Sequence, residues 1–377
     1  MANNNNKDKC NVPHLRFPEF SGEWKKCKFG DIATGFDYGM NAAAKPFDGE
    51  NKYIRITDID EASSTYNDKD IVSPDGRLTD NYVVNNRDIL LVRTGASTGK
   101  SYLYRKSDGK LYYAGFLIRA NITEHNPYFV FSQLHTHRYW RWVSIMSARS
   151  GQPGINSQEY SSFPIFTTSL HEENKISTLL SLLNERIVTQ NKIIEKLQSL
   201  IKGLAVTLTT KGKPNTTISQ CLECHSSTLQ ESEVLPNGLC KVFGANGLVG
   251  YKDVPQMNGD AILVIKDGSG VGTVSYSQGK FSVIGTLNYL TVIGNNDLRY
   301  LYFALSVFNF QPYKTGMAIP HIYFKDYGKA KIYCPPLAEQ KRVANVLDKL
   351  ESKLFVEQEL LASFNQQKQY LLGQMFI

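Results

Sequence analysis

The sequence repeats itself at an offset of 167 residues, and this repeat constrains the fold more than any other feature of the chain. Residues 165–187 read IFTTSLHEENKISTLLSLLNERI, and residues 332–354 read IYCPPLAEQKRVANVLDKLESKL. The two segments share isoleucine, leucine or glutamate at five aligned positions. We therefore expect a chain made of two similar halves.

Each copy continues in a pattern of apolar residues that are spaced alternately four and three apart. Such spacing over many turns predicts a long helix that packs along one seam against another helix. The seam positions are Ile176, Leu180, Leu183, Ile187, Ile194, Leu197, Ile201 and Leu204 in the first copy, and Val343, Leu347, Leu350, Leu354, Leu361, Phe364, Lys368 and Leu371 in the second. A polar residue interrupts both seams at the same place, Gln190 in the first and Glu357 in the second.

The two seams therefore agree in phase as well as in composition. We expect two helices of about 35 to 40 residues, each roughly 55 Å long. Two ordinary amphipathic helices that are buried separately would show the same periodicity. Seams of equal length favour instead a pair that faces each other as an antiparallel coiled coil.

A segment with the pattern of β-strands precedes each predicted helix. In both copies an apolar strand runs into a glycine-rich turn, at residues 88–99 and, with one residue inserted, at residues 260–272. A further strand, an aromatic run typical of a helix and a basic loop follow. These lie at residues 116–120, 127–146 and 149–151 in the first copy, and at residues 290–293, 298–310 and 314–316 in the second.

The order of these patterns predicts an α+β protein with a pseudo-two-fold internal repeat, in which two tandem globular α+β domains alternate with two long helices. The polar run at residues 209–217 reads as the linker between the copies. The predicted boundaries are 1–12 for a disordered N-terminus, 13–168 for the first globular domain, 169–208 for the first helix, 209–335 for the second globular domain and 336–377 for the second helix.

Composition excludes several classes of protein. A chain of 377 residues with 42% hydrophobic and 20% charged residues can bury two globular cores, so it is neither fibrous nor wholly disordered. The longest apolar stretch, around residues 300–310, is about half the roughly 20 residues of a membrane helix, and the first ten residues lack the apolar core of a signal peptide. Six irregularly spaced cysteines then read as reduced thiols, and we expect a cytoplasmic protein.

The net charge of +7 is a mild excess, and both halves of the chain share it. A basic excess of this size permits contact with a polyanion such as DNA, although it does not demand it.

A phosphate-loop-like string at residues 95–101, GASTGKS, follows a predicted strand. It is one residue shorter than a phosphate-binding loop, and residues 102–105 read as a strand rather than as the helix that would hold phosphate. We expect no ATP binding here. The loop can still present Arg93 and Lys100 to a DNA phosphate.

The string Cys221-Leu222-Glu223-Cys224-His225 matches a haem attachment motif and, with Cys240, supplies four possible zinc ligands. Haem attachment requires export, and a zinc site normally has a second closely spaced pair of ligands. We therefore expect ordinary thiols on a helix or a strand, with no metal.

Motifs for catalysis are incomplete. Asn126-Pro127-Tyr128-Phe129 lacks the second proline of a methyltransferase loop, and the glycines at residues 268–272 are explained more simply by a hairpin turn. The mixed cationic and aromatic run at residues 135–142 is typical of a helix with one face in the core and basic residues on the other. The chain by itself is therefore not expected to be an enzyme.

Several stretches resemble the specificity subunits of type I restriction–modification systems. They are LRFPEF at 15–20, GEW at 22–24, FGDI at 29–32, VFGANG at 242–247 with Gly250 and Tyr251, the helix starts at 171–173 and 338–341, and YLLGQMF at 370–376. The resemblance covers essentially the whole chain. Its only local departures are His171 and Glu173, where the second copy has Ala338 and Gln340.

This resemblance implies a non-catalytic role in host defence. Each globular domain would be a target-recognition domain that reads one half of a bipartite double-stranded DNA sequence. The helix pair would set the gap between the halves and dock two modification subunits, which bind S-adenosylmethionine and methylate adenine at N6. Restriction subunits with ATP-dependent motor activity, which uses Mg, would join in the full complex. No cofactor, metal or membrane contact is implied for this chain.

Candidate DNA contacts lie on the glycine-bearing loops, because phosphate contacts need Lys or Arg and base readout needs loop side chains that reach base edges. They are Arg93, Ser97, Thr98, Lys100, Arg149 and Gln152 in the first domain, and Asn246, Tyr251, Lys266, Ser269, Lys314 and His321 in the second. Two other functions stay open. A self-contained DNA-modifying enzyme would need cofactor motifs, and a structural coiled-coil adaptor would leave the two globular domains unexplained.

Overall fold

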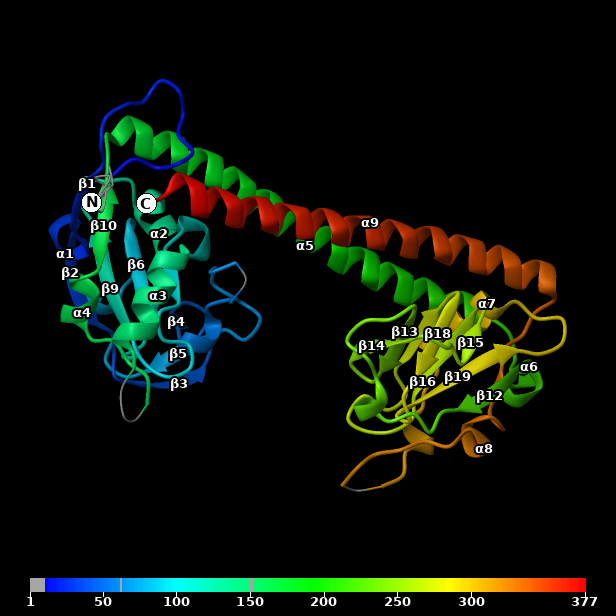
Figure 1. Ribbon diagram of the computed structural model, residues 1–377. Coiled ribbons are helices and arrows are strands. Elements are labelled where there is room, and N and C mark those ends of the chain that lie inside the picture. The colour runs from blue at the N-terminus through cyan, green and yellow to red at the C-terminus, as the bar shows by residue number, and fades with distance from the viewer. Residues whose placement is uncertain (1–10, 62, 149–151, 317) are drawn as a thin grey trace, which may run out of the picture. The chain divides into compact units, whose positions relative to one another are not determined.

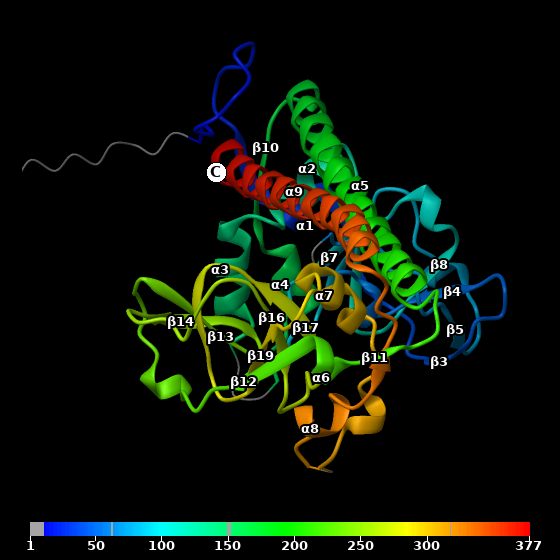
Figure 2. The ribbon, with the colours of Figure 1, turned by 90° about the vertical axis from the view of Figure 1, so that its right-hand side faces the viewer.

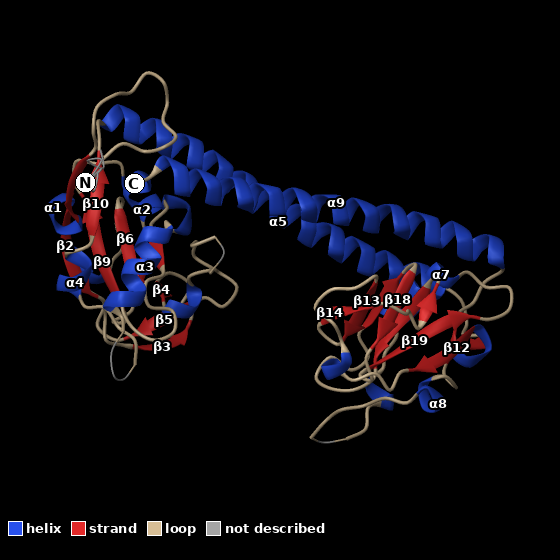
Figure 3. Cartoon of the chain, viewed as in Figure 1, coloured by secondary structure: helices blue, strands red, loops and turns tan. Residues whose placement is uncertain are grey.

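The computed structural model describes residues 11–61, 63–148, 152–316 and 318–377. The chain divides into two compact units, which Figure 1 colours by residue number. The first unit comprises Met1–Asn191 and Leu360–Ile377, and the second comprises Lys192–Glu359. Each unit contains both sheets and helices (Figure 3), so the α+β class predicted from the sequence is confirmed.

The first unit is built on a four-stranded antiparallel sheet in the order β2-β9-β6-β7. All five residues of β6, Asp88-Ile89-Leu90-Leu91-Val92, are buried, because cores pack on both faces of this central strand. The strands are β1 (Lys25–Lys28), β2 (Ala33–Tyr38), β3 (Ala43–Pro46), β4 (Lys52–Ile54), β5 (Val72–Asp75), β6 (Asp88–Val92), β7 (Ser101–Leu103), β8 (Leu111–Tyr113), β9 (Leu117–Ile122) and β10 (Pro164–Thr167).

Short helices cover one face of this sheet. They are α1 (Phe29–Ile32), α2 (Pro127–Gln133), α3 (His137–Met146) and α4 (Ser157–Ser161). The sequence pattern predicted one helix-like run over 127–146, and this prediction was wrong at its centre. The run breaks after Gln133 because the Thr136 hydroxyl donates to Gln133 O at 2.8 Å and accepts from Tyr139 N at 3.3 Å, which starts α3 as a new helix.

The second unit has a sheet of the same order, β12-β19-β16-β17, and a second sheet in the order β14-β13-β18-β15. The strands are β11 (Thr216–Thr217), β12 (Leu222–Ser226), β13 (Cys240–Gly244), β14 (Gly247–Lys252), β15 (Met257–Asn258), β16 (Ala261–Ile265), β17 (Val274–Ser277), β18 (Lys280–Val283), β19 (Leu287–Val292) and β20 (Lys331–Ile332). The helices are α6 (Ile218–Cys221), α7 (Leu298–Ser306) and α8 (Phe324–Tyr327).

The matching sheets also continue in the same way. β9 and β19 occupy the second place in their sheets, and a capped helix follows each of them along the chain, α2 after β9 and α7 after β19. Asn126 caps α2 by accepting from Tyr128 N at 2.9 Å, and Asp297 caps α7 by accepting from Tyr300 N at 2.9 Å. The glycine cluster at 268–272 forms the turn between β16 and β17, which confirms the predicted hairpin.

Two long helices pass through both units: α5 (Leu170–Thr209) has 40 residues and α9 (Leu337–Met375) has 39. In the first unit the start of α5 packs against the end of α9, with Leu180 and Leu372 in one core cluster (Figure 1, Figure 2). Lys368 Nζ donates to Asn184 Oδ1 at 2.9 Å, four residues further along α5 and four residues back along α9. The two helix segments of this unit are therefore antiparallel.

The same holds in the second unit, where the end of α5 meets the start of α9. Ala205 shares a core cluster with Val343 and Leu347, and Lys211 forms an ion pair with Glu339. The predicted helix lengths of about 35 to 40 residues are confirmed.

Candidate nucleic-acid interface

A loop held against a second loop carries most of the candidate residues of the first unit. The loop after β6, residues 93–100, bonds to residues 152–156 through Gly95 N to Pro153 O at 3.0 Å and Ile155 N to Arg93 O at 2.9 Å. Gly95 and Gly99 have φ of +80° and +94°, a backbone conformation that favours glycine. We call residues 93–100 with 152–156 the first paired loop.

The second unit repeats this arrangement between β16 and β17. Gly268 N donates to Pro320 O at 2.9 Å, and Ile322 N donates to Lys266 O at 2.9 Å. Gly268 and Gly272 have φ of +98° and +89°, as their counterparts do in the first unit. Pro320 and Ile322 follow the corresponding residues of the first paired loop by 167 positions. Residues 266–273 with 320–322 form the second paired loop.

A cation stands at the start of each paired loop. The Arg93 guanidinium carbon lies 4.8 Å from the ring centroid of Tyr38, and Lys266 occupies the equivalent place in the second unit. Both side chains are half-buried. Lys100, at the end of the first loop, lies 3.4 Å from a carboxylate oxygen of the exposed Glu61.

The other candidates of the first unit divide by where their polar atoms point. The Thr98 hydroxyl is buried and donates to Gly95 O at 2.7 Å, so it holds the turn together. Ser97 is half-buried and Gln152 is exposed on the same paired loop. Arg149 lies outside the described residues.

Candidates of the second unit fall on two separate parts of the fold. Ser269 is exposed on the second paired loop, and the Thr315 and His321 backbones bond there next to Lys314. The His321 ring lies 5.0 Å from the Tyr323 ring, edge to face. Asn246 and Tyr251 instead lie on the β13–β14 hairpin of the other four-stranded sheet.

A cavity of about 590 Å³ opens beside the first paired loop. Its walls include Tyr38, Met40, Tyr53, Arg93 and Phe116. Phe116 is 60% exposed although it is a large aromatic residue. Sequence reasoning missed Tyr38 and Phe116, because only the tertiary contacts leave these rings exposed beside Arg93.

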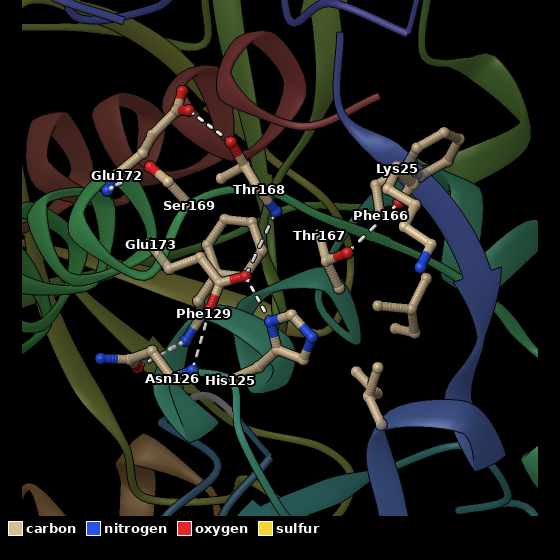
Figure 4. A network of polar contacts seen from close by, with 12 residues as sticks. Lys25, His125, Asn126, Phe129, Phe166, Thr167, Thr168, Ser169, Glu172 and Glu173 are labelled. Atoms are coloured by element: carbon tan, nitrogen blue, oxygen red, sulfur yellow. Dashed lines mark hydrogen bonds and ion pairs between the residues drawn. The ribbon is translucent and has the colours of Figure 1, made fainter.

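Two acidic residues anchor the start of α5 to the first unit (Figure 4). The buried Glu173 accepts from Asn126 N at 2.9 Å and from His125 Nδ1 at 2.8 Å, and the latter bond raises the pKa of His125. Glu172 accepts from Arg16 Nε at 2.7 Å and from Thr168 Oγ1 at 2.6 Å. Burial alone would raise the pKa of Glu172, but these hydrogen bonds and the Arg16 charge leave it below its ordinary value.

Every predicted seam residue of α5 and α9 is buried or half-buried. Those that are buried are Ile176, Leu180, Ile187, Ile194, Val343 and Leu347; those that are half-buried are Leu183, Leu197, Ile201, Leu204, Leu350, Leu354, Leu361, Phe364, Lys368 and Leu371. The polar Gln190 and Glu357 are buried at their seam positions. Buried and half-buried positions therefore follow the four-three spacing in both helices.

The cysteine motif does not assemble into a metal site. Cys221 Sγ lies 4.0 Å from Cys334 Sγ, His225 Nε2 bonds to Thr291 Oγ1 at 2.8 Å, and Cys240 Sγ bonds to Asp253 O. Over the described ranges, no group of three or more His, Cys, Asp or Glu side chains is placed to hold a metal ion. The helices in that same part of the chain include none that is long and apolar enough to cross a membrane.

The sequence comparisons point to one family. Residues 224–366 match the family model described as the type I restriction modification DNA specificity domain. The type I restriction enzyme EcoprrI specificity subunit of Escherichia coli is 24% identical over 123 residues, which cover 33% of this chain and 29% of that relative. The match thus spans less than a third of the curated relative.

Solved structures resemble the whole chain. The type I restriction–modification S subunit from M. genitalium has a TM-score of 0.68 at 17% identity, with 97% of this chain and 99% of that chain covered. A chain from a study of complex assembly and conformational transition in the type I R-M system has a TM-score of 0.54 at 16% identity, with 97% and 99% covered. At such identities the likeness shows the fold. Residues 224–366 thus match the type I restriction modification DNA specificity domain, and the fold of the chain resembles that of solved S subunits of type I restriction–modification systems.

Proposed function

We propose that this chain is the non-catalytic DNA-specificity subunit of a type I restriction–modification complex, and that each unit reads one half of a bipartite target. The observation that carries the proposal is the repeated paired loop. Both units hold a glycine-turned loop against a second loop by equivalent backbone bonds, and both place a cation, Arg93 or Lys266, at the same point.

The chemistry of the paired loops suits duplex DNA. Lysine and arginine side chains supply affinity through phosphates, and loop side chains that reach base edges supply specificity. Exposed polar residues such as Gln152 and Ser269 stand beside the two cations on their respective loops. The net charge of +7, shared by both halves, supports attraction to the duplex at both half-sites.

The two helices would act as the spacer of the target. Their lengths, the burial along the four-three seams and the antiparallel contacts within each unit support an antiparallel coiled coil. In this proposal residues 13–168 and 209–335 are the target-recognition domains, and residues 169–208 and 336–377 are the spacers. A rigid helical spacer converts its rise into both distance and rotation along the duplex.

The outer faces of the helices would dock two modification subunits. Large apolar side chains that the helix pair does not bury lie on both helices, and they include Leu179, Leu182, Ile193 and Leu200 on α5 and Val346, Phe355, Val356, Leu360 and Tyr370 on α9. Leu179 and Val346 are 167 residues apart, as are Ile193 and Leu360. Repeated exposed apolar positions suit two copies of one partner. S-adenosylmethionine would bind those partners, and ATP and Mg would bind the restriction subunits that join them in the cytoplasm.

The test is to express the chain with the modification subunit of its own locus and to map N6-methyladenine across the host genome. The expected result is one new motif with two short halves separated by a fixed number of unspecified bases. A stable complex that methylates no new motif would favour an adaptor role. Methylation by the isolated chain, without the modification subunit, would favour a self-contained enzyme.

A further inference from the structure

The Arg93 side chain is held in place before any DNA arrives. Its backbone N–H donates to Phe116 O at 3.0 Å and its backbone carbonyl accepts from Ile155 N, so the residue is fixed between the residue that precedes β9 and the second segment of the paired loop. The guanidinium then lies over the ring of Tyr38. That ring is in turn placed by its hydroxyl, which accepts from Ser157 N at 3.3 Å and whose pKa this bond lowers.

Within the described part of the chain, no carboxylate binds this guanidinium. Arg55 binds Asp58 and Arg119 binds Asp37, whereas for Arg93 no ion pair occurs among the residues that the structure describes. A guanidinium stacked on an aromatic ring keeps its planar fork of N–H donors directed outward. The bidentate pairing of such a fork with guanine O6 and N7 is the commonest specific contact in the major groove.

The second unit lacks each element of this arrangement. Lys266 N donates to Thr286 O at 3.0 Å, as Arg93 N does to Phe116 O, so Thr286 stands where the first unit has Phe116. Ser226 pairs with Asn288 in β12–β19, as Tyr38 pairs with Ile118 in β2–β9. Lysine, serine and threonine thus replace arginine, tyrosine and phenylalanine. A lysine ammonium is a point charge that cannot form the planar bidentate contact.

We infer that Arg93 reads a guanine in the half-site bound by the first unit, that Tyr38 is a positioning residue for it, and that the second unit has no such contact at Lys266. This inference rests on the proposed function and deepens it. The two half-sites must then differ chemically: the first requires a guanine at the point that Arg93 reaches, whereas the second is bound at the equivalent point through a charge contact.

The experiment compares Arg93→Lys and Arg93→Ala with the wild-type chain in the complex with its modification subunit, by mapping N6-methyladenine in host DNA. Arg77→Lys is the matched control, because Arg77 is an exposed arginine of the same unit outside the paired loop. Loss of one bidentate contact is expected to lower discrimination at one guanine of one half by roughly 5- to 150-fold. The other half of the target and the gap are expected to stay unchanged. The Arg77→Lys control is expected to keep the whole wild-type motif.

Two variants of Tyr38 test whether this residue positions Arg93 or only supports the fold. Tyr38→Phe keeps the ring and loses only the hydroxyl bond to Ser157, so it is expected to relax the guanine less than Tyr38→Leu, which removes the ring and is expected to relax the same guanine as the Arg93 variants. An unchanged motif in Arg93→Ala, or equal loss of methylation at all sites, would overturn the inference. A wild-type chain that directs no bipartite motif would instead overturn the proposed function.

Discussion

Glu173 and Gln340 stand 167 residues apart and accept the same backbone hydrogen bond in their two units. Glu173 accepts from Asn126 N at 2.9 Å, and Gln340 accepts from Asp297 N at 2.8 Å, so each long helix is tied to the residue that caps the helix after the central sheet. The difference between acid and amide, which weakened the repeat in the sequence, leaves this bond intact. It changes the second partner: Glu173 binds His125, whereas the Gln340 amide donates to Pro335 O.

The bond between Glu173 and His125 therefore makes the unfolding free energy of the first unit depend on pH. The hydrogen bond from Glu173 raises the pKa of His125 above its ordinary 6.5, so between 6.5 and the raised value the folded state holds a proton that the unfolded state has released. The stabilisation is complete below pH 6.5 and is lost as the pH rises through the raised pKa. We expect His125→Gln to flatten this fall, measured by denaturant unfolding of the full chain across that range. His14→Gln, at an exposed histidine, is the control; the same flattening there would contradict the assignment.

Glu172 and its repeat partner Glu339 offer a matched comparison of ion pairs. Glu172 is 1% exposed and faces the mostly buried Arg16, whereas Glu339 pairs with Lys211 at the surface. Removal of one partner of a buried pair leaves an uncompensated charge, so Glu172→Ala is expected to cost about 3 kcal/mol of unfolding free energy. Glu339→Ala is expected to cost less than about 1 kcal/mol. Equal losses in denaturant titrations of the two variants would refute this account.

The lowered pKa of Glu172 also predicts acid sensitivity. The stabilisation is present above its ordinary pKa of 4.5 and is lost as the pH falls through the lowered value. Glu172→Gln is expected to remove this acid-dependent part of the unfolding free energy. An acid titration with the same slope in wild type and variant would show that another group is responsible.

The helix seam can be tested by two buried leucines. Replacing Leu180 and Leu347 together with Asp would bury two charges without partners, so we expect the helix pair to separate and assembly with the modification subunits to be lost. The measurement is co-purification with those subunits together with far-UV circular dichroism. Normal assembly of this variant would refute the prediction that the seam residues hold the two helices together.

Exposed positions on the same helices give the contrasting variant. The double variant Leu182→Asp with Phe355→Asp places both charges in water. Its free energy of unfolding is therefore expected to stay within about 0.5 kcal/mol of the wild-type value. Co-purification of the modification subunits is expected to fall at least tenfold. Full assembly of this pair of variants would exclude these faces as the docking surface.

The spacer role predicts a change in the target itself. One extra heptad inserted in α5 after Asn191 and another in α9 after Glu359 would lengthen the pair by roughly 10 Å, which corresponds to about three base pairs. Mapping N6-methyladenine is expected to return the same two half-sites with a gap longer by that amount. An unchanged gap would mean that something other than the helices sets it.

Much of the fold could be predicted from the sequence because its strongest signals are local. The four-three spacing gave helices of the predicted length, and the turn glycines at 268–272 marked a hairpin. The strand that follows Gly99 excludes a phosphate loop, as the pattern at 102–105 indicated. In each of these cases the neighbours along the chain decide the structure.

The candidate site depends on contacts between distant segments, which the sequence does not reveal. The bond from Gly95 to Pro153 joins residues 58 positions apart in loops without periodicity. Thr98 resembled a free loop hydroxyl, but its oxygen turns back to Gly95. Tyr38 and Phe116 were missed because aromatic residues are buried by default, and only tertiary packing leaves these two beside a cation.

The discontinuity of the first unit has a consequence for the order of events on the ribosome. The second unit is one contiguous segment, whereas the first needs residues 360–377, which are synthesised only after the second unit is complete. Until then Trp24 and Phe129 lack the ring of Phe376, which lies 6.1 Å and 5.3 Å from theirs. At ordinary elongation rates the ribosome needs roughly 10 to 40 seconds to synthesise the remaining residues, and this apolar surface stays uncovered during that time. A nascent or prematurely terminated chain therefore displays a patch that chaperones and proteases can recognise, so only chains translated through residue 376 hide it.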